Sequence, residues 1–313
     1  MKEIKGKRKM EVGVTCRNKK DITLLKIIKK NLFNIFLAII FFFIICITLY
    51  PFLNVLAISL NDPIDTMRSV NFIIPRKFTF SNYIYVFTQN DLLTPFLMSI
   101  ARTFIGTPVS VICTAMIGYV LSRRDFYFNK LFTFLFIITM YVSGGLVPEY
   151  LLMSRTLHLN NSFLVYILPG VVWVYNIILV RAFIDGLPYA LQEAAMLDGA
   201  NDFKIWYKVI LPLCKPVLAT VALFYAVGQW NSFMDTYLYA RKLPTLQYVL
   251  YEIMESAKIH IDPHAVTQTT QNAVSPMSVR MAITIIATVP ILLVYPFLQK
   301  YFVGGMTIGA VKD

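Results

Sequence analysis

The chain has 313 residues, of which 57% are hydrophobic and 15% are charged, and its mean hydropathy is +0.63. This composition lies outside the range of an ordinary soluble domain. The net charge of +12 is compatible with nucleic-acid binding, but the basic residues flank long apolar stretches, which favours a role in membrane topology and no nucleic-acid partner.

Six stretches are apolar and long enough to cross a hydrocarbon core, which needs about 20 residues of helix. They are predicted at about Ile35–Leu53, Pro95–Leu121, Leu131–Val147, Phe163–Ile184, Val209–Trp230 and Met281–Phe302. The first follows a basic segment, as in a signal peptide. Its apolar run exceeds the usual length of about 7–15 residues, so we expect an uncleaved signal-anchor. The sequence therefore predicts an all-α membrane protein with six transmembrane helices in one domain, residues 31–304.

Basic residues predict the orientation of these helices. The first 30 residues form a basic N-terminal segment with eleven Lys and Arg. Further basic residues follow the second and fourth predicted spans, namely Arg123, Arg124, Lys130, Lys204 and Lys208. Positive residues beside a span are retained on the cytoplasmic side, so we expect both termini, including the tail 305–313, to be cytoplasmic.

Two longer segments are predicted on the outer side, Asn61–Asp91 and Asn231–Arg280. Pro63 and Pro75 argue against a helix in the first half of the earlier segment, whereas residues 81–87 could form a short one. In the later segment, residues 246–259 have apolar side chains at helical spacing and predict an amphipathic helix.

The sequence carries no recognisable catalytic or metal-binding constellation. The cysteines show no CxxC spacing and are interpreted as small apolar side chains; they are Cys16, Cys46, Cys113 and Cys214. His260 and His264 are four residues apart, but Pro263 lies between them, so a surface loop is favoured over a zinc site. Since no phosphate-binding GxxxxGK[ST] or GxSxG pattern occurs, we expect a protein that is not an enzyme and binds no cofactor.

The polar segment at about 185–208, between the fourth and fifth predicted spans, has the pattern of a folded cytoplasmic loop. Gly199 permits a sharp turn after a short helix, and Asp202 is predicted to cap the next one. In that second helix, apolar residues such as Trp206 alternate with Lys204 and Lys208. Such a unit could dock into a protein partner or lie on lipid head groups, and the residues alone leave both readings open.

The same segment resembles the EAA loop of permease subunits of bacterial ATP-binding-cassette (ABC) importers. That pattern is EAA, three residues, Gly, nine residues and I-x-L-P, and Val209 stands here in place of the Ile. The matching positions are Glu193, Ala194, Ala195, Gly199, Leu211 and Pro212. Further stretches, among them "GYVLSRRDF", "SGGLVPEYLL", "AAMLDGAN", "LPLCKP" and "GQWNSF", are similar to the carbohydrate-uptake branch, and specifically to its maltose-type second permease subunit.

This resemblance implies a type I importer permease (MetI-like) fold in the plasma membrane of a Gram-positive bacterium. It implies a second homologous permease, two cytoplasmic ATPase subunits that bind the ATP and magnesium, and an extracellular lipid-anchored binding protein that delivers a carbohydrate. Glu193 would pair with a basic group of an ATPase, and Asp198 and Gly199 would form the turn of the coupling loop. A secondary active transporter and an ABC permease for a non-sugar solute are the alternatives.

Polar side chains within spans are candidates for the substrate pathway, because they usually face a cavity or a partner. Gln229, Trp230 and Asn231 combine amides with an aromatic ring, which suits sugar recognition, and Ser232 follows them. Asn176 is a second candidate. Arg102 is favoured as an interface anchor whose side chain snorkels to the outer surface.

Overall fold

The structure is a computed structural model that describes residues 33–68, 73–89, 91–259 and 275–310. The predicted basic segment 1–30 lies outside these residues, as do His260 and His264. Within the described ranges the chain is helical apart from turns, loops and one isolated β-bridge between Asn61 and Phe78. This agrees with the predicted all-α fold.

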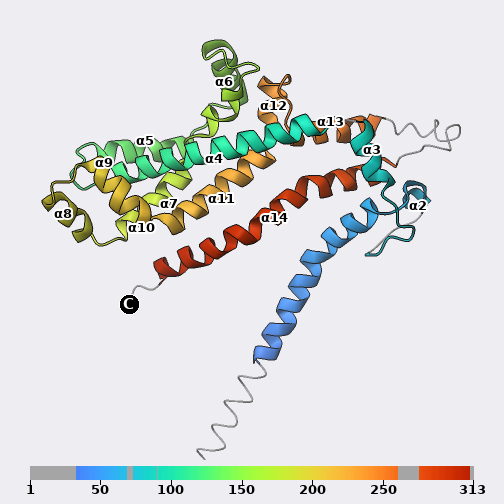
Figure 1. Cartoon of the computed structure of the whole chain (residues 1–313), viewed down its shortest axis with the longest axis horizontal. Helices are drawn as coiled ribbons and strands as arrows, with labels where there is room; N and C mark the ends of the chain where they lie inside the picture. Colours follow the sequence, from blue (N-terminus) through green and yellow to red (C-terminus); the bar gives the residue numbers. More distant parts are fainter. Residues whose placement is uncertain (1–32, 69–72, 90, 260–274, 311–313) are drawn as a thin grey trace, which may run out of the picture.

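Three helices form the centre of the molecule: α4 (Leu93–Ser122), α7 (Val174–Asp185) and α11 (Lys215–Asn231). They pack against one another, and α14 (Pro276–Ala310) packs against α11 and against α13 (Leu246–Ile259). Figure 1 shows α4 and α11 running side by side along the long axis, with the helix Phe33–Ser59 diverging from this bundle. Apolar side chains of all three central helices form one buried cluster.

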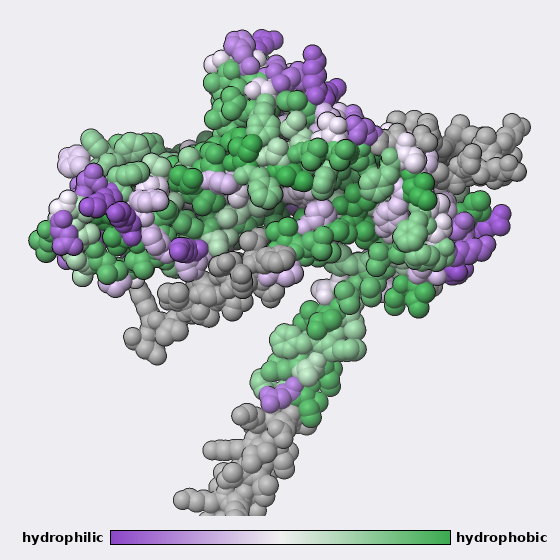
Figure 2. All heavy atoms as spheres, viewed as in Figure 1, coloured by the Kyte–Doolittle hydropathy of each residue, from purple (hydrophilic) through white to green (hydrophobic). Residues whose placement is uncertain are grey.

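The surface of the molecule has the distribution that a membrane imposes. Figure 2 shows hydrophobic residues covering the first helix and most of the bundle, and hydrophilic residues gathered near its ends and at the protruding α6 (Leu146–Leu151). None of the most apolar part of Phe33–Ser59 is buried against the rest of the chain. Because water would oppose this much apolar exposure, the surface is suited to lipid or to another membrane subunit.

Three helices are long and apolar enough to span a membrane by themselves: Phe33–Ser59, α4 and residues 276–294 of α14. Three bent pairs of helices correspond to the remaining predicted spans. If each bent pair is counted as one span, the described residues contain the six that the sequence predicts.

The bends show where the helix is broken within three of the predicted spans. In the third, α5 (Asn129–Tyr141) is followed by a 111° bend and then by α6 (Leu146–Leu151) and the π-helical turn η1 (Leu152–Thr156). Gly145 has a φ of 85° at this break, which a side chain would disfavour. The break therefore falls just before the predicted end of this span at Val147.

The fourth span is interrupted in the same way. It consists of the short 3₁₀ helices η2 (Phe163–Tyr166) and η3 (Leu168–Gly170), a 50° bend, and then α7. Pro169 and Gly170 account for the interruption, because neither favours the interior of a helix.

The fifth span begins later than predicted. Four short segments precede it: α8 (Ala190–Leu197), α9 (Asp202–Ile205), the π-helical turn η4 (Trp206–Ile210) and α10 (Leu211–Leu213). An 82° bend then separates α10 from α11. Pro216 lacks the N–H that would bond to residue 212, so the helix cannot continue regularly through this point. Val209–Leu213 therefore belongs to the loop that precedes the span.

The segment after the first helix folds into a small cap. It contains α2 (Pro63–Arg68) and the predicted short helix, α3 (Ser81–Gln89). The prediction of no helix near Pro63 was wrong, because proline is favoured in the first turn and Asp62 caps the N–H groups of Ile64 and Asp65 at 3.0 Å. At the same end of the bundle, α12 (Met234–Tyr239) and the predicted amphipathic helix α13 follow α11, and α13 shares a buried apolar cluster with α3.

Candidate functional site

The turn between α8 and α9 has the geometry that the sequence predicts for Gly199. Its φ is +74°, and the N–H groups of Gly199 and Ala200 donate to the carbonyls of Met196 and Ala195 at 2.9 and 3.0 Å. This is the Schellman arrangement, which places a left-handed residue just after a helix. No atom lies within 4 Å of the position that a Cβ would take, so glycine is required here by backbone conformation and not by space.

The cap of α9 differs from the prediction. Asn201, not Asp202, is the N-cap, and its side-chain oxygen accepts a hydrogen bond from the N–H of Lys204 at 2.9 Å. The helix thus begins one residue earlier in register than the sequence suggested. The consequence is that the carboxylate of Asp202 is left available for another partner.

The coupling segment, which we define as residues 190–213, has a buried and an exposed side. Ile205, Trp206 and Ile210 are buried in the same cluster as the central helices. Leu197 and Phe203 are 89% and 64% exposed. The segment is therefore anchored to the bundle through α9 and η4, while α8 and the turn present apolar side chains to the surroundings.

The residues that match the EAA pattern lie along this segment. Glu193 is in the first turn of α8, and Asp198 is the residue at which that helix ends. The exposed members of the set are Glu193, Ala194, Asp198, Gly199 and Pro212, and the partly buried ones are Ala195 and Leu211.

Arg123 connects this segment to α4. Its side chain is 8% exposed, and its guanidinium lies 2.9 Å from Asp202 and 2.7 Å from Asp125. It also donates to the amide oxygen of Gln192 on α8 at 3.4 Å. The hydrogen bond from Arg123 holds the pKa of the Asp125 carboxyl below its usual value. The sequence had suggested only a topological role for this arginine.

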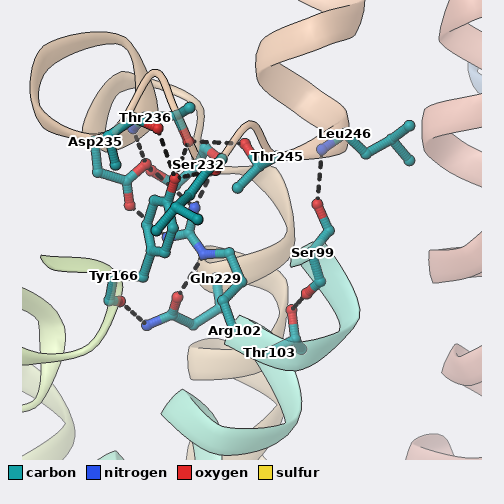
Figure 3. A network of polar contacts seen from close by, with 12 residues as sticks. Ser99, Arg102, Thr103, Tyr166, Gln229, Ser232, Asp235, Thr236, Thr245 and Leu246 are labelled. Atoms are coloured by element: carbon teal, nitrogen blue, oxygen red, sulfur yellow. Dashed lines mark hydrogen bonds and ion pairs between the residues drawn. The ribbon is translucent and has the colours of Figure 1, made fainter. Parts of the chain in front are cut away.

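A second polar network lies where α4 and α11 approach α12 (Figure 3). The Arg102 side chain is 2% exposed and forms an ion pair with Asp235. Its Nε donates to Oε1 of Gln229 at 3.0 Å, and Nε2 of Gln229 donates to the carbonyl of Tyr166 at 3.0 Å. The prediction that Arg102 snorkels to the surface was wrong, because the guanidinium is enclosed by protein and neutralised there.

This network forms one wall of a cavity of about 430 Å³. The volume lies in the usual range for small-molecule sites, roughly 300–1,000 Å³. Polar and charged groups in its lining include Arg102, Glu149, Gln229 and Asp235. The aromatic residues in its lining are Tyr166, Trp173, Phe224, Tyr225 and Tyr239. Aromatic faces combined with a few fixed polar groups are suited to a hydroxylated ring compound.

The structure separates the residues that the sequence grouped as a pathway. Gln229 and Ser232 line the cavity. Trp230 does not: its indole N–H donates to the carbonyl of Ala287 at 3.2 Å, and its ring packs edge-on against Phe96. This placement argues against stacking of Trp230 on a sugar.

The two remaining candidates also lie outside the cavity lining. Asn231 is exposed at the end of α11. Asn176 is fully buried within α7, and neither atom of its amide has a hydrogen-bond partner in the part of the chain that the structure describes. We have no physical account of this unsatisfied amide.

Asp235 and Trp173 are among the lining residues that the sequence reasoning missed. Asp235 could have been sought because an arginine inside a span usually has an acidic partner. Trp173 lies at the break in the fourth span and is 49% exposed, and its backbone N–H donates to the hydroxyl of Tyr225 at 3.1 Å. Its neighbours Pro169 and Gly170 were a signal in the sequence for that break.

Among the described residues, no group of three or more His, Cys, Asp and Glu side chains could hold a metal ion. The cysteines that lie within these ranges, Cys46, Cys113 and Cys214, are not in disulfides.

A family model described as "Binding-protein-dependent transport system inner membrane component" matches residues 83–308. The chain belongs to this family. Its members are permease components of ABC importers, which are transport proteins and not enzymes. Membership excludes the secondary transporter that the sequence left as an alternative. It also implies a membrane-embedded complex with a further permease, ATPase subunits and a binding protein.

Individual relatives cover nearly the whole chain. "Polygalacturonan/rhamnogalacturonan transport system permease protein YtcP" of Bacillus subtilis (strain 168) is 34% identical over 91% of this chain and 99% of its own length. "Protein LplC" of the same organism is 38% identical over 85% of this chain and 90% of its own length. A solved chain from a bacterial ABC transporter involved in the import of the acidic polysaccharide alginate is 28% identical, with a TM-score of 0.69, and the match covers 87% of this chain and 97% of that one.

Proposed function

We propose that this chain is one of two permease subunits of an ATP-driven importer that takes up an oligosaccharide through the plasma membrane of a Gram-positive bacterium. The carbohydrate assignment is supported by relatives named for polygalacturonan and arabinooligosaccharide transport, several of them from Bacillus. The observation that carries the proposal is the coupling segment, in which a left-handed Gly199 in the EAA register exposes Glu193 and Leu197 beside a turn anchored to the bundle.

In this proposal the coupling segment faces the cytoplasm and fits a cleft of one of two ATPase subunits. Those subunits bind the ATP and magnesium, and this chain binds neither. Glu193 is exposed at the start of α8, where it can reach a basic group of the ATPase. Closure of the ATPases moves the two coupling segments toward each other, and the permease pair changes from inward-facing to outward-facing.

The orientation follows from the positive charges. With both termini and the coupling segment in the cytoplasm, α12, α13 and the cap of α2 and α3 lie on the outer side. An extracellular lipid-anchored binding protein would deliver the sugar there. Reporter fusions after Asp198 should then indicate the cytoplasm, and fusions after Arg76 should indicate the outside.

We propose that the sugar path of this subunit runs through the cavity beside Arg102 and Asp235. Gln229 is bonded on both sides, to Arg102 and to Tyr166, so it holds the wall in place and has few groups left for a ligand. Trp173 is half-exposed within the lining and offers an aromatic face to a pyranose ring. We therefore assign the stacking role to Trp173 instead of Trp230.

The test is reconstitution of the complete complex in proteoliposomes with its binding protein and radiolabelled oligosaccharides. Uptake of an oligosaccharide that requires both ATP and the binding protein is the expected result. If the complex imports a non-sugar solute and no oligosaccharide, the result would support the remaining alternative, an ABC importer of another substrate class. Uptake that proceeds without ATP would contradict the proposal entirely.

A further inference from the structure

Helix α8 carries the coupling motif, and apolar packing holds only part of it. Gln192 is the only residue of α8 that is buried, and Ala195 and Met196 are partly buried against the central cluster. The following elements are different, because Ile205, Trp206 and Ile210 are buried in the central cluster. A helix that must transmit force needs a fixed orientation, so polar contacts have to supply what packing does not.

Arg123 supplies contacts at the point where α4, α8 and α9 meet. One of its terminal nitrogens donates to the carboxylate of Asp125 at 2.7 Å and forms an ion pair with the carboxylate of Asp202 at 2.9 Å. The other donates to Gln192 at 3.4 Å and to the hydroxyl of Tyr119 at 3.5 Å. The planar guanidinium can serve all four partners at once, which a lysine ammonium cannot do in one geometry.

The adjacent arginine adds a second contact to the same helix. The guanidinium carbon of Arg124 lies 4.5 Å from the centre of the ring of Tyr189, the residue directly before α8. A cation–π contact of this kind contributes about 0.5–1 kcal/mol at an exposed site. Arg123 therefore contacts α8 and α9, and Arg124 contacts the residue directly before α8.

We infer that Arg123 is a positioning residue that fixes the angle of α8 and α9 against α4, and that this contact transmits the movement of the ATPase to the bundle. The inference rests on the proposed function. A purely topological arginine would have no need of burial: the side chain of Arg123 is 8% exposed and three of its contacts are to carboxylates or an amide. Burial and pairing are the signs of a structural contact.

The two carboxylates provide a matched comparison. Asp202 lies on the coupling segment, whereas Asp125 lies in the same loop as Arg123. Replacing either one removes one ion pair from the same guanidinium, but only Asp202→Ala removes a link between the segments. Because the carboxylates of Asp202 and Asp125 are 71% and 60% exposed, water screens each pair, and single replacements should have modest effects.

The experiment measures sugar imported per ATP hydrolysed in proteoliposomes that contain the whole complex, normalised to assembled complex. We expect Arg123→Gln, which loses every charged contact, to lower this ratio about tenfold. Asp202→Ala should lower it about threefold, Asp125→Ala should leave it within twofold of wild type, and Arg123→Lys should fall between Arg123→Gln and wild type. Lys130→Gln removes a charge from the same basic cluster and should match wild type.

A distance measurement distinguishes positioning from a general loss of stability. Spin labels at Leu197→Cys and Tyr127→Cys, which are 89% and 90% exposed, report on α8 relative to the loop after α4 in a variant without its native cysteines. The distance distribution should broaden in Arg123→Gln and remain narrow in Lys130→Gln. Unchanged distances together with an unchanged ratio in Arg123→Gln would overturn the inference, whereas a wild-type complex without sugar-stimulated ATP hydrolysis would instead overturn the proposed function.

Discussion

Removal of the Asp235 carboxylate should destabilise the protein more than removal of any exposed carboxylate. The side chain of Arg102 is 2% exposed in the wild-type structure, and in Asp235→Ala its guanidinium would retain only Gln229 and the carbonyl of Ser232 as acceptors. Breaking a buried ion pair costs about 3–5 kcal/mol. Since Asp235 is 20% exposed, we take the lower end, about 3 kcal/mol, which corresponds to a decrease in apparent Tm of roughly 5–10 °C.

The assay is thermal unfolding of the purified complex in detergent, with two comparisons. Asp185→Ala breaks an exposed pair with Arg181, whose closest atoms are 3.5 Å apart, and should change the apparent Tm by about 2 °C or less. The double variant Arg102→Met with Asp235→Leu removes both charges and should recover at least half of the decrease in apparent Tm that Asp235→Ala causes. The reasoning is refuted if Asp235→Ala unfolds at the wild-type temperature, or if the double variant is less stable than Asp235→Ala.

Three further outcomes are expected. Gly199→Val places a β-branched residue at a φ of +74° and should abolish sugar-stimulated ATP hydrolysis while the complex still assembles, whereas Gly199→Asn, whose side chain tolerates the left-handed conformation better, should retain part of that hydrolysis. Trp173→Ala should reduce uptake per assembled complex roughly tenfold. Trp230→Ala should instead reduce the amount of assembled complex. Equal uptake per complex in both variants would contradict the proposal that the sugar passes through this cavity. The pKa of Asp125 in the folded protein lies below 3.8, the usual carboxyl value. The ion pair of Asp125 therefore stabilises the fold at neutral pH, and this stabilisation is lost as the pH falls through the lowered pKa. The difference in Tm between wild type and Asp125→Asn should accordingly shrink below pH 3.8.

The positions of the spans were predictable because hydropathy is a property of consecutive residues. The bends within them were less accessible, since a break depends on how the helix on each side packs. Gly145 and Pro169 were nevertheless visible in the sequence as breakers. At the fifth span the apolar run continues through Val209–Leu213, so composition alone could not show that these residues belong to the loop.

The sequence predicts the turn of the coupling segment well, but it does not predict the polar network beside the cavity. The turn at Gly199 is local, and its spacing within a known pattern was enough to locate it. Arg102 and Asp235 are 133 residues apart, and nothing in either neighbourhood identifies the other. Gln229 and Trp230 illustrate a different limit: consecutive residues on a helix point in directions about 100° apart, and here Gln229 lines the cavity whereas the ring of Trp230 packs against Phe96.

Helix α4 joins the two parts of the site. Arg102 near its beginning is paired with Asp235, which follows α11, and Arg123 just after its end is paired with Asp202, which precedes α11. The two arginines are 21 residues apart in the chain (123 − 102), or about 30 Å along a helix at 1.5 Å per residue. An ion pair at each end, together with the packing of α4 against α11 between them, ties these helices together along their length. We therefore expect a displacement of the coupling segment to move the wall of the cavity with it, because α4 carries an ion pair to the coupling segment at one end and an ion pair to the cavity wall at the other.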